Sequence, residues 1–205
     1  MNSVHGVMTL SPVIPVLTIE DASWASAIAE ALVAGGLRAL EVTLRTPAGL
    51  EAIAEMAKVP GAVVGAGTVL NARDVEASVD AGAQFIVSPG LTEPLATAAI
   101  TSGAPFLPGI ATAADIMRGL DLGLSHFKFF PAEAAGGRKA LASLAAPFPH
   151  VRFCPTGGIT LASAPDWLAM PQVLCVGGSW LVPSGRPDVA AIERGAAEAV
   201  RLGRV

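Results

Sequence analysis

Short apolar segments rich in β-branched and aromatic residues recur along the chain at nearly regular intervals. Eight are found, at residues 13–19, 38–44, 62–69, 84–90, 105–110, 126–130, 151–155 and 173–178, and their starts lie 21 to 25 residues apart. Each is apolar over most of its length, which is typical of strands buried on both faces of a parallel sheet. The pattern therefore predicts eight parallel strands.

The intervals between these segments are rich in alanine and carry the spacing of amphipathic helices, for example at residues 21–32, 50–57 and 72–79. Residues with capping side chains, Asp21, Asn71 and Thr92, stand at the start of three such intervals. Eight strand–helix units in 205 residues predict one α/β domain over residues 1–205, a (β/α)8 TIM barrel. The alternative is a doubly wound open sheet, which is less well supported because no strand is followed by G-x-G-x-x-G.

Composition and charge exclude several classes of protein. Hydrophobic residues make up 52% of the chain and charged residues 15%, which argues against disorder. No apolar run reaches the ~18 residues of a spanning helix, and the N-terminus lacks the features of a signal peptide, so we expect a soluble, cytoplasmic protein with no membrane partner. The net charge of −4 and the scattered arginines predict no nucleic-acid partner.

The cysteines and histidines do not form a metal-binding pattern. Cys154 and Cys175 lie in apolar segments, where reduced core thiols are usually found. His5, His126 and His150 belong to different segments and do not have the spacing of zinc ligands. We therefore expect no metal site.

In a (β/α)8 barrel, active sites lie at the C-terminal ends of the strands. Alternation along the segment LEVTLRT points Glu41, Thr43 and Arg45 inward, with the leucines and the valine facing the helices. Glu41 is then deep in the barrel and Arg45 is at its mouth. A buried ion pair with a purely structural role is one interpretation, and recognition of a substrate carboxylate by Arg45 is the other.

Lys128 stands among three phenylalanines in the segment HFKFFPAE. The same alternation turns His126, Lys128 and Phe130 inward, so Lys128 lies in an apolar interior, unlike Lys58 and Lys139, the other two lysines of the chain. A buried amine is a candidate nucleophile for a Schiff base with a ketone, and Glu41 is the candidate to relay protons. The alternative is a structural pair between Lys128 and Glu41. Glu133 is a weaker candidate, expected in the first turn of the next helix.

The last two strands are each followed by a pair of glycines. Thr156-Gly157-Gly158 and Gly177-Gly178-Ser179 occupy the positions where barrel enzymes commonly bind a phosphate through backbone N–H groups. Thr156, Gly157, Gly158, Gly178 and Ser179 are thus predicted to bind phosphate, and the alternative is that the glycines only make tight turns.

Together, the motifs EVTLRT (41–46), GAGTV (65–69), SPG (88–90), FKFFPAE (127–133), PTGGI (155–159) and VGGSW (176–180) closely resemble those of the 2-keto-3-deoxy-6-phosphogluconate aldolase family. The family consists of class I aldolases, which are trimeric (β/α)8 barrels. The resemblance covers almost the entire chain, and these motifs show no departure from the family pattern. It implies cleavage of the phosphorylated 2-keto acid to pyruvate and glyceraldehyde 3-phosphate, without cofactor or metal, by a homotrimer.

The resemblance also implies a role for individual residues. Lys128 would be the Schiff-base lysine and Glu41 the acid–base residue. Arg45 and Thr68 would bind the pyruvyl carboxylate, Pro89 and Phe130 would shape the pocket around it, and Thr156, Gly157, Gly158 and Ser179 would hold the phosphate.

Several rival functions stay open at this point. Within the family, 2-keto-3-deoxy-6-phosphogalactonate and unphosphorylated 4-hydroxy-2-oxoglutarate are rival substrates. Outside it, a non-covalent sugar-phosphate isomerase or epimerase would use Glu41 as a base, and a non-catalytic binder of sugar-acid phosphates would need neither Lys128 nor Glu41 for chemistry.

Overall fold

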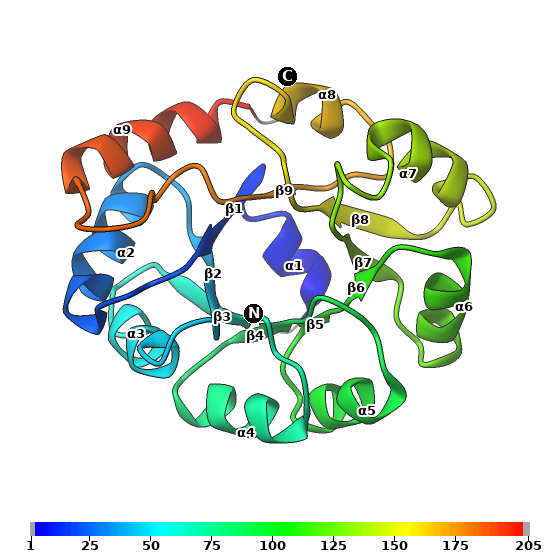
Figure 1. The fold of residues 1–205 in the computed structure, drawn as a ribbon, viewed down its shortest axis with the longest axis horizontal. Helices are drawn as coiled ribbons and strands as arrows, with labels where there is room; N and C mark the ends of the chain where they lie inside the picture. The colour runs from blue at the N-terminus through cyan, green and yellow to red at the C-terminus, as the bar shows by residue number, and fades with distance from the viewer. Residues whose placement is uncertain (1–2, 203–205) are drawn as a thin grey trace.

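The computed structural model describes residues 3–202 and shows an α/β fold in which parallel strands surround a common interior and all helices but the first lie outside them (Figure 1). The six-stranded sheet has the order β5-β4-β3-β2-β1-β9 and the three-stranded sheet the order β6-β7-β8. The strands are β1 Val13–Leu17, β2 Ala39–Thr43, β3 Val63–Gly67, β4 Phe85–Val87, β5 Phe106–Leu107, β6 Gly109–Ile110, β7 His126–Phe129, β8 Arg152–Pro155 and β9 Val176–Gly178.

The helices alternate with the strands, as the sequence pattern predicts. They are α1 Val4–Met8, the 3-10 helix η1 Ala22–Trp24, α2 Ala25–Ala34, α3 Gly49–Met56, α4 Ala72–Asp80, α5 Glu93–Thr101, α6 Ala113–Asp121, α7 Gly137–Ala145, α8 Ala164–Leu168 and α9 Val189–Val200. The start predicted for the helix at residues 21–32 is wrong, because Asp21 caps the 3-10 helix η1 and α2 begins only at Ala25. Asn71 caps α4 through the Asp74 N–H, whereas Thr92 precedes α5 without a side-chain hydrogen bond.

Two of the apolar segments form shorter strands than predicted. The run at 105–110 forms β5 and β6, separated by Pro108, which has no N–H to donate to a ladder. The run at 173–178 contributes only β9 as regular strand, although isolated parallel bridges join Phe153 to Val173 and Thr156 to Gly177. These two bridges connect β8 with the segment that ends in β9.

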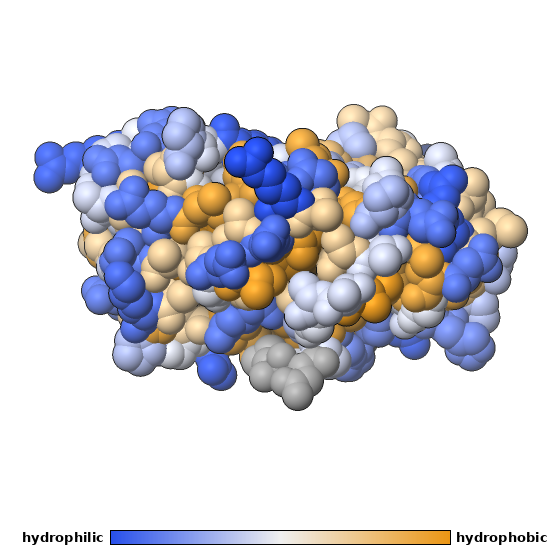
Figure 2. Space-filling model, turned by 90° about the horizontal axis from the view of Figure 1, so that it is seen from below, coloured by the Kyte–Doolittle hydropathy of each residue, from blue (hydrophilic) through white to orange (hydrophobic). Residues whose placement is uncertain are grey.

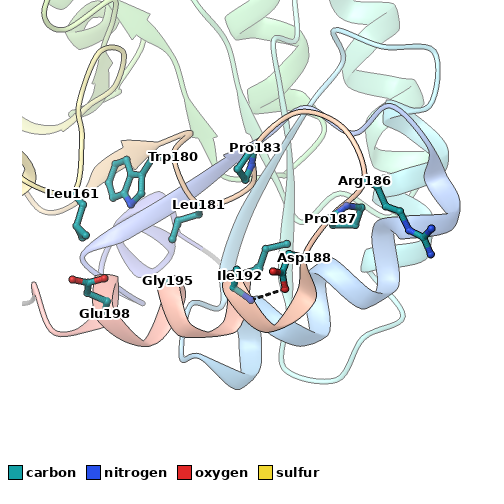
Figure 3. A pocket seen from close by; sticks show the side chains of 11 residues that line it. Leu161, Trp180, Leu181, Pro183, Arg186, Pro187, Asp188, Ile192, Gly195 and Glu198 are labelled. Carbon is teal, nitrogen blue, oxygen red and sulfur yellow. Dashed lines mark hydrogen bonds between the residues drawn. The ribbon is translucent and has the colours of Figure 1, made fainter.

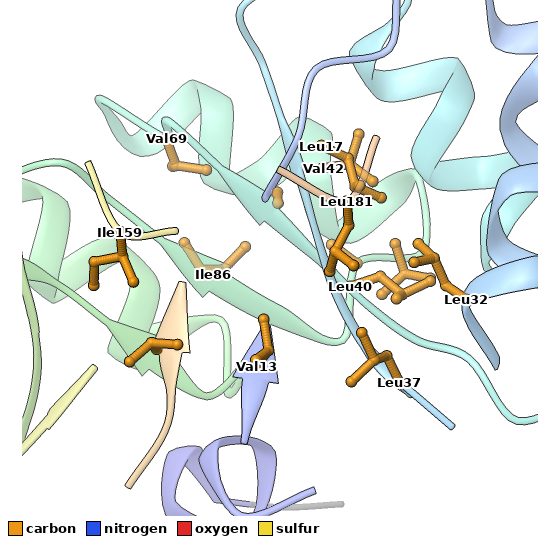
Figure 4. Close-up of a cluster of buried hydrophobic side chains, with 14 of the residues drawn as sticks. Val13, Leu17, Leu32, Leu37, Leu40, Val42, Val69, Ile86, Ile159 and Leu181 are labelled. Carbon is orange, nitrogen blue, oxygen red and sulfur yellow. The ribbon is translucent and has the colours of Figure 1, made fainter. Parts of the chain in front are cut away.

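The outward faces of the strands pack against the helices and form the larger apolar core. Leu40 and Val42 of β2 and Phe127 and Phe129 of β7 are fully buried there, so the predicted outward faces of both strands are confirmed. Figure 4 shows part of this core, in which Leu40 lies near Leu32 of α2 and Val42 lies near Leu17 of β1. Burial of these side chains is the main favourable contribution to folding.

A second, smaller core fills the interior that the strands enclose. Val7 and Met8 of α1 pack there against inward-facing side chains of the strands, which are Ile14, Ala39, Val63, Phe85, Val87, Leu107, Cys154 and Cys175. Helix α1 lies in the middle, with strands of both sheets around it (Figure 1). The sequence pattern did not predict this helix, because at five residues it is too short to show a periodicity. Within residues 3–202, no helix combines the length and apolar character needed to cross a lipid bilayer.

Candidate active site

A buried ion pair joins β2 and β7. Lys128 Nζ donates a hydrogen bond of 2.8 Å to Glu41 Oε1, across 87 positions of sequence. Lys128 is 4% exposed and Glu41 is 3% exposed. Both side chains point inward, so the alternation predicted for the two strands is confirmed. Lys58 and Lys139 are exposed, as expected.

The surroundings of this pair are unusual for two charged groups. Removing a carboxylate and an ammonium from water costs several kcal/mol per ion, and their attraction offsets this only with good geometry. Phe130 lies beside the ammonium, with its ring centroid 5.4 Å from Lys128 Nζ, so it supplies a weak cation–π contact. The pair is therefore not explained by stability alone, since apolar residues of similar volume would serve the core as well or better.

Glycines on β3 make the space that Glu41 occupies. Thr43 pairs with Gly67 in the parallel ladder, and a Cβ on Gly67 would overlap the Glu41 carboxylate. Gly65, which pairs with Glu41, similarly leaves room for the ring of Phe85. The segment GAG on β3 is thus explained by close approach of neighbouring side chains, a reason for glycine inside a strand.

Thr68 follows β3 directly and has a left-handed backbone, with φ of 60°. It is the one residue other than glycine with positive φ among the described part of the chain. For a β-branched residue this conformation is strained, and such strain is found preferentially at functional sites. The half-buried Thr68 lies just after the C-terminal end of β3, where a ligand-binding side chain was expected.

Arg45 and Pro89 stand beyond the ends of their strands. Arg45 is exposed, two residues after β2, and within residues 3–202 it has no hydrogen-bond or ion-pair partner. Its guanidinium is thus free for a ligand, and the alternative of an ion pair between Glu41 and Arg45 is wrong. Pro89 is half-buried, and a Cβ on Gly109 would overlap its carbonyl group. Because Gly109 pairs with Lys128, Pro89 lies next to the strand neighbour of the lysine.

The loops after β8 and β9 lie side by side. Thr156 is buried and pairs with Gly177, which has no side chain because a Cβ there would overlap the Thr156 hydroxyl. Gly157 and Gly158 have φ of 106° and 78°, values that favour glycine. Ser179 is exposed at the end of the second loop. The two glycine pairs thus serve backbone geometry and close packing; Gly157 is half-buried and Gly158 exposed, whereas Gly177 and Gly178 are buried.

Glu133 does not lie in the first turn of a helix, so that prediction is wrong. It belongs to a turn that precedes α7, and its N–H donates to the Gly157 carbonyl at 3.1 Å. Its carboxylate accepts a hydrogen bond of 3.1 Å from Trp167 Nε1. The glycines at 136 and 137, both with positive φ, delay the start of α7. Glu133 therefore supports the loop after β8.

Two thiols lie beside the ion pair. Cys154 pairs with Lys128 in the ladder between β7 and β8, and both Cys154 and Cys175 are free and buried, as predicted. A hydrogen bond with Cys154 raises the pKa of the Cys175 thiol well above its usual value, and burial and the charges of Cys154 and Glu41 act in the same direction. The Cys175 thiol is therefore protonated near neutral pH.

Two of the three histidines are in contact with each other. His5 of α1 and His126 of β7 are joined by a hydrogen bond of 3.1 Å between their ring nitrogens, which the sequence did not predict, while His150 is exposed elsewhere. Within residues 3–202, no three side chains of His, Cys, Asp or Glu come together as a metal site requires.

Comparison with known proteins gives a consistent result over nearly the whole chain. A family model described as KDPG and KHG aldolase matches residues 4–195. The 2-dehydro-3-deoxy-phosphogluconate aldolase of Zymomonas mobilis is 62% identical over 199 residues, covering 97% of this chain and 96% of that protein.

Solved structures show the same similarity. The 2-keto-3-deoxy-6-phosphogluconate aldolase of Z. mobilis ZM4, crystallised with 3-phosphoglycerate, has a TM-score of 0.97 and 61% identity, covering 100% of this chain and 98% of that chain. The KDPG aldolase of Legionella pneumophila, with pyruvate captured as a covalent carbinolamine intermediate, has a TM-score of 0.86 and 43% identity, covering 97% and 95%.

Proposed function

Because this chain belongs to the KDPG and KHG aldolase family, we propose that it is a class I aldolase that cleaves 2-keto-3-deoxy-6-phosphogluconate (KDPG) to pyruvate and glyceraldehyde 3-phosphate. The observation that carries the proposal is the buried contact of 2.8 Å between Lys128 and Glu41, which puts an amine nucleophile and a proton acceptor in one apolar interior. The L. pneumophila relative, with its carbinolamine of pyruvate, supports a covalent step of this kind.

In this reaction Lys128 attacks the C2 carbonyl of the 2-keto acid. A proton passes from Nζ to Glu41 along their hydrogen bond, which leaves a neutral amine to form the new C–N bond. The carbinolamine loses its hydroxyl group as water and becomes an iminium cation. Arg45 and Thr68, beyond the ends of β2 and β3, hold the pyruvyl carboxylate, and Pro89 and Phe130 shape the space around it.

The iminium cation is the electron sink for cleavage of the C3–C4 bond. Glu41, through a water molecule, removes the proton of the C4 hydroxyl, the C3–C4 electron pair moves to the iminium nitrogen, and glyceraldehyde 3-phosphate departs. The enamine then takes a proton at C3, and hydrolysis releases pyruvate and regenerates Lys128. Every proton that Glu41 accepts is returned in a later step, so the residues end in their starting state.

The loops after β8 and β9 make a phosphorylated substrate the better match. Thr156, Gly157, Gly158, Gly178 and Ser179 are proposed to bind the phosphate through main-chain N–H groups and hydroxyls. The Z. mobilis structure with 3-phosphoglycerate supports an anionic phosphate ligand in this family. Unphosphorylated 4-hydroxy-2-oxoglutarate is proposed as a second, poorer substrate, and the 2-keto-3-deoxy-6-phosphogalactonate alternative is not favoured.

We further propose that the chain is a single domain in which the two sheets close into a complete (β/α)8 TIM barrel. The bridges from Phe153 to Val173 and from Thr156 to Gly177 support closure on one side, and the direct succession of β5 and β6 supports it on the other. The free thiols agree with a reducing compartment such as the cytoplasm.

A homotrimer is the proposed assembly. Leu70, Val79 and Ile100 are exposed in and before α4 and α5, and on this side of the molecule apolar patches lie among polar ones (Figure 2). Exposed apolar surface of this kind is common where subunits meet. Sedimentation at micromolar concentration tests the assembly, and a monomer would contradict it.

Cleavage of KDPG tests the function directly. Pyruvate released by the purified protein is measured through a coupled lactate dehydrogenase reaction, for KDPG, its galactonate epimer and 4-hydroxy-2-oxoglutarate. The proposal expects turnover of KDPG with the highest kcat/KM, and no turnover by Lys128→Arg. Residual turnover by Lys128→Arg would favour a non-covalent isomerase-type mechanism, and phosphate-dependent binding without any turnover would favour a binding protein.

A further inference from the structure

Trp180 lies directly behind one of the two loops proposed to hold the phosphate. It follows Ser179 in the chain and is partly buried against the core between strands and helices. A Cβ on Gly178 would overlap the six-membered ring of Trp180, so the indole touches the main chain of that glycine. The glycine thus admits the indole, and the indole in turn restricts where the backbone before Ser179 can lie.

The other side of Trp180 borders a cavity of about 310 Å³ between α9 and the segment 180–188 (Figure 3). Ile192 and Gly195 of α9 contribute to its wall, and so does Leu161, which lies three residues after Gly158. The charged residues around it, Arg186, Asp188 and Glu198, are exposed, and Asp188 caps α9. Since Lys128 and Glu41 do not line it, this cavity is separate from the reacting groups.

Ser179 depends on its neighbours for its position. Within the part of the chain that the structure describes, neither its hydroxyl nor its N–H has a hydrogen-bond partner. These groups are available to a ligand, but no hydrogen bond of their own fixes them. The indole of Trp180, packed against Gly178 on one side and bordering the cavity on the other, is the contact that holds the loop in place.

We infer that Trp180 is a positioning residue that fixes Gly178 and Ser179 for the phosphate group and thereby sets the preference for phosphorylated over unphosphorylated 2-keto acids. The inference rests on the proposed function. Donors to a phosphate act only at hydrogen-bond distance, so a loop that shifts by about 1 Å loses much of their contribution. The pyruvyl half of the substrate, held near Lys128, is far enough along the substrate to be unaffected.

The test compares Trp180→Ala and Trp180→Phe with a matched control, Trp24→Ala. Trp24, in η1, is likewise partly buried and packed against the same core. For Trp180→Ala we expect kcat/KM on KDPG to fall about tenfold, mainly through KM, as expected for a misplaced binding group. On 4-hydroxy-2-oxoglutarate we expect a change of less than about twofold, because this substrate has no phosphate to misplace. Trp24→Ala should leave the ratio between the substrates unchanged.

An equal fall on both substrates, or an unchanged ratio in Trp180→Ala, would overturn the inference. Trp180→Phe keeps an aromatic ring. Its kcat/KM on KDPG, relative to that on 4-hydroxy-2-oxoglutarate, should fall by about a third as much as in Trp180→Ala. If thermal unfolding shows that Trp180→Ala does not fold, the Trp180→Phe variant is the test. A lower ratio of kcat/KM on KDPG to kcat/KM on 4-hydroxy-2-oxoglutarate supports the inference, and an unchanged ratio overturns it.

A binding measurement separates this inference from the proposed function. Calorimetric titration with 3-phosphoglycerate needs no turnover, and Trp180→Ala should bind it about tenfold more weakly than the wild type and Trp24→Ala do. Equal affinity in all three proteins would overturn the inference while leaving the aldolase proposal intact. Conversely, a wild-type protein that forms no adduct with pyruvate would contradict the aldolase proposal, whatever the titration shows for Trp180.

Discussion

His126 and Lys128 lie two residues apart on the same face of β7, yet they belong to different regions of the interior. His126, at the start of the strand, contacts His5 of α1. Lys128 contacts Glu41, near the end at which Thr68 and the glycine loops lie. A spacing of two residues along β7 therefore separates the contact between the two histidines from the candidate nucleophile Lys128.

The two regions differ in what fills them. Around α1, inward-facing positions carry apolar side chains that pack against Val7 and Met8, in a cluster that extends to Cys154, the ladder partner of Lys128. Around Lys128 and Glu41, inward positions carry glycine at 67, 109 and 177, and space is left for polar side chains. The inward face of a strand thus predicts burial, and the size of the neighbouring residues decides whether a buried position packs against apolar side chains or keeps space for polar groups.

The largest expected effect separates Lys128 from His126. Lys128→Met should lower kcat/KM on KDPG by roughly 10⁴- to 10⁶-fold, as loss of a covalent nucleophile does in other enzymes. His126→Asn, on the same face of the same strand, should stay within about threefold of wild type, because the altered group only packs against α1. The coupled pyruvate assay measures both, and similar losses in the two variants would contradict the comparison.

Glu41→Gln removes the proton acceptor and keeps the shape of the side chain. Loss of general acid–base catalysis typically costs about 10²- to 10⁴-fold in rate, and we expect a fall of this size in kcat. The amide cannot accept a proton from Lys128 Nζ, so single-turnover formation of the pyruvate adduct should also slow. Unchanged kinetics would show that Glu41 serves only to neutralise the lysine.

Lys128→Met also tests the stability of the buried pair. It leaves the Glu41 carboxylate without its partner, which should destabilise the fold by roughly 3–5 kcal/mol at neutral pH. Adding Glu41→Gln in the same chain removes the unpaired charge and should restore most of that loss. Denaturant unfolding of the single and double variants measures the difference, and equal stability of the two would contradict a buried, paired carboxylate.

Gly67→Ala tests the space beside Glu41. The added methyl group would overlap the carboxylate, so the strand or the side chain must shift, at a cost of about 1–3 kcal/mol in unfolding free energy. Gly195→Ala in α9 is the control, since its Cβ would lie 3.4 Å from Leu181 Cδ2, an ordinary contact. Activity should fall only in the first variant. A stable, fully active Gly67→Ala protein would show that the space is not needed.

The smallest expected effect is a pH dependence at the α1 end. Burial lowers the pKa of His126 below its ordinary value of 6.5, with the positive charges of His5 on α1 and Arg152 on β8 adding to the effect. Because the folded state binds this proton less readily than the unfolded state, the contribution to stability is complete above pH ~6.5 and is lost as the pH falls through the lowered pKa. The melting temperature from pH 7.5 to 5 should fall less steeply in His126→Asn, and identical slopes would contradict the account.

The repeat of apolar segments was sufficient to predict the parallel strands and the inward positions of Glu41 and Lys128, because alternation along a strand is a local property. The sequence did not predict α1, which is held by tertiary contacts of Val7 and Met8. It also misplaced Glu133, since Gly136 and Gly137 at the start of α7 and the hydrogen bond from Trp167 outweighed the tendency of the segment to start a helix.

Other features of the site arise from contacts between distant residues. The strained backbone of Thr68, the room that Gly67 leaves for Glu41 and the contact of Trp180 with Gly178 each join neighbours in space. Glycines inside predicted strands were the one available signal for such close approaches. The role of Trp180 had no signal in the local pattern, because a partly buried tryptophan near a turn usually only packs.

Lys128 is proposed to act as a covalent nucleophile. The most direct measurement is intact-mass spectrometry after mixing the protein with pyruvate and sodium borohydride, followed by peptide mapping. The account predicts one reduced pyruvyl adduct per chain, located at Lys128 and absent in Lys128→Ala. A folded protein that forms no adduct under saturating pyruvate, or an adduct at Lys58 or Lys139, would contradict it.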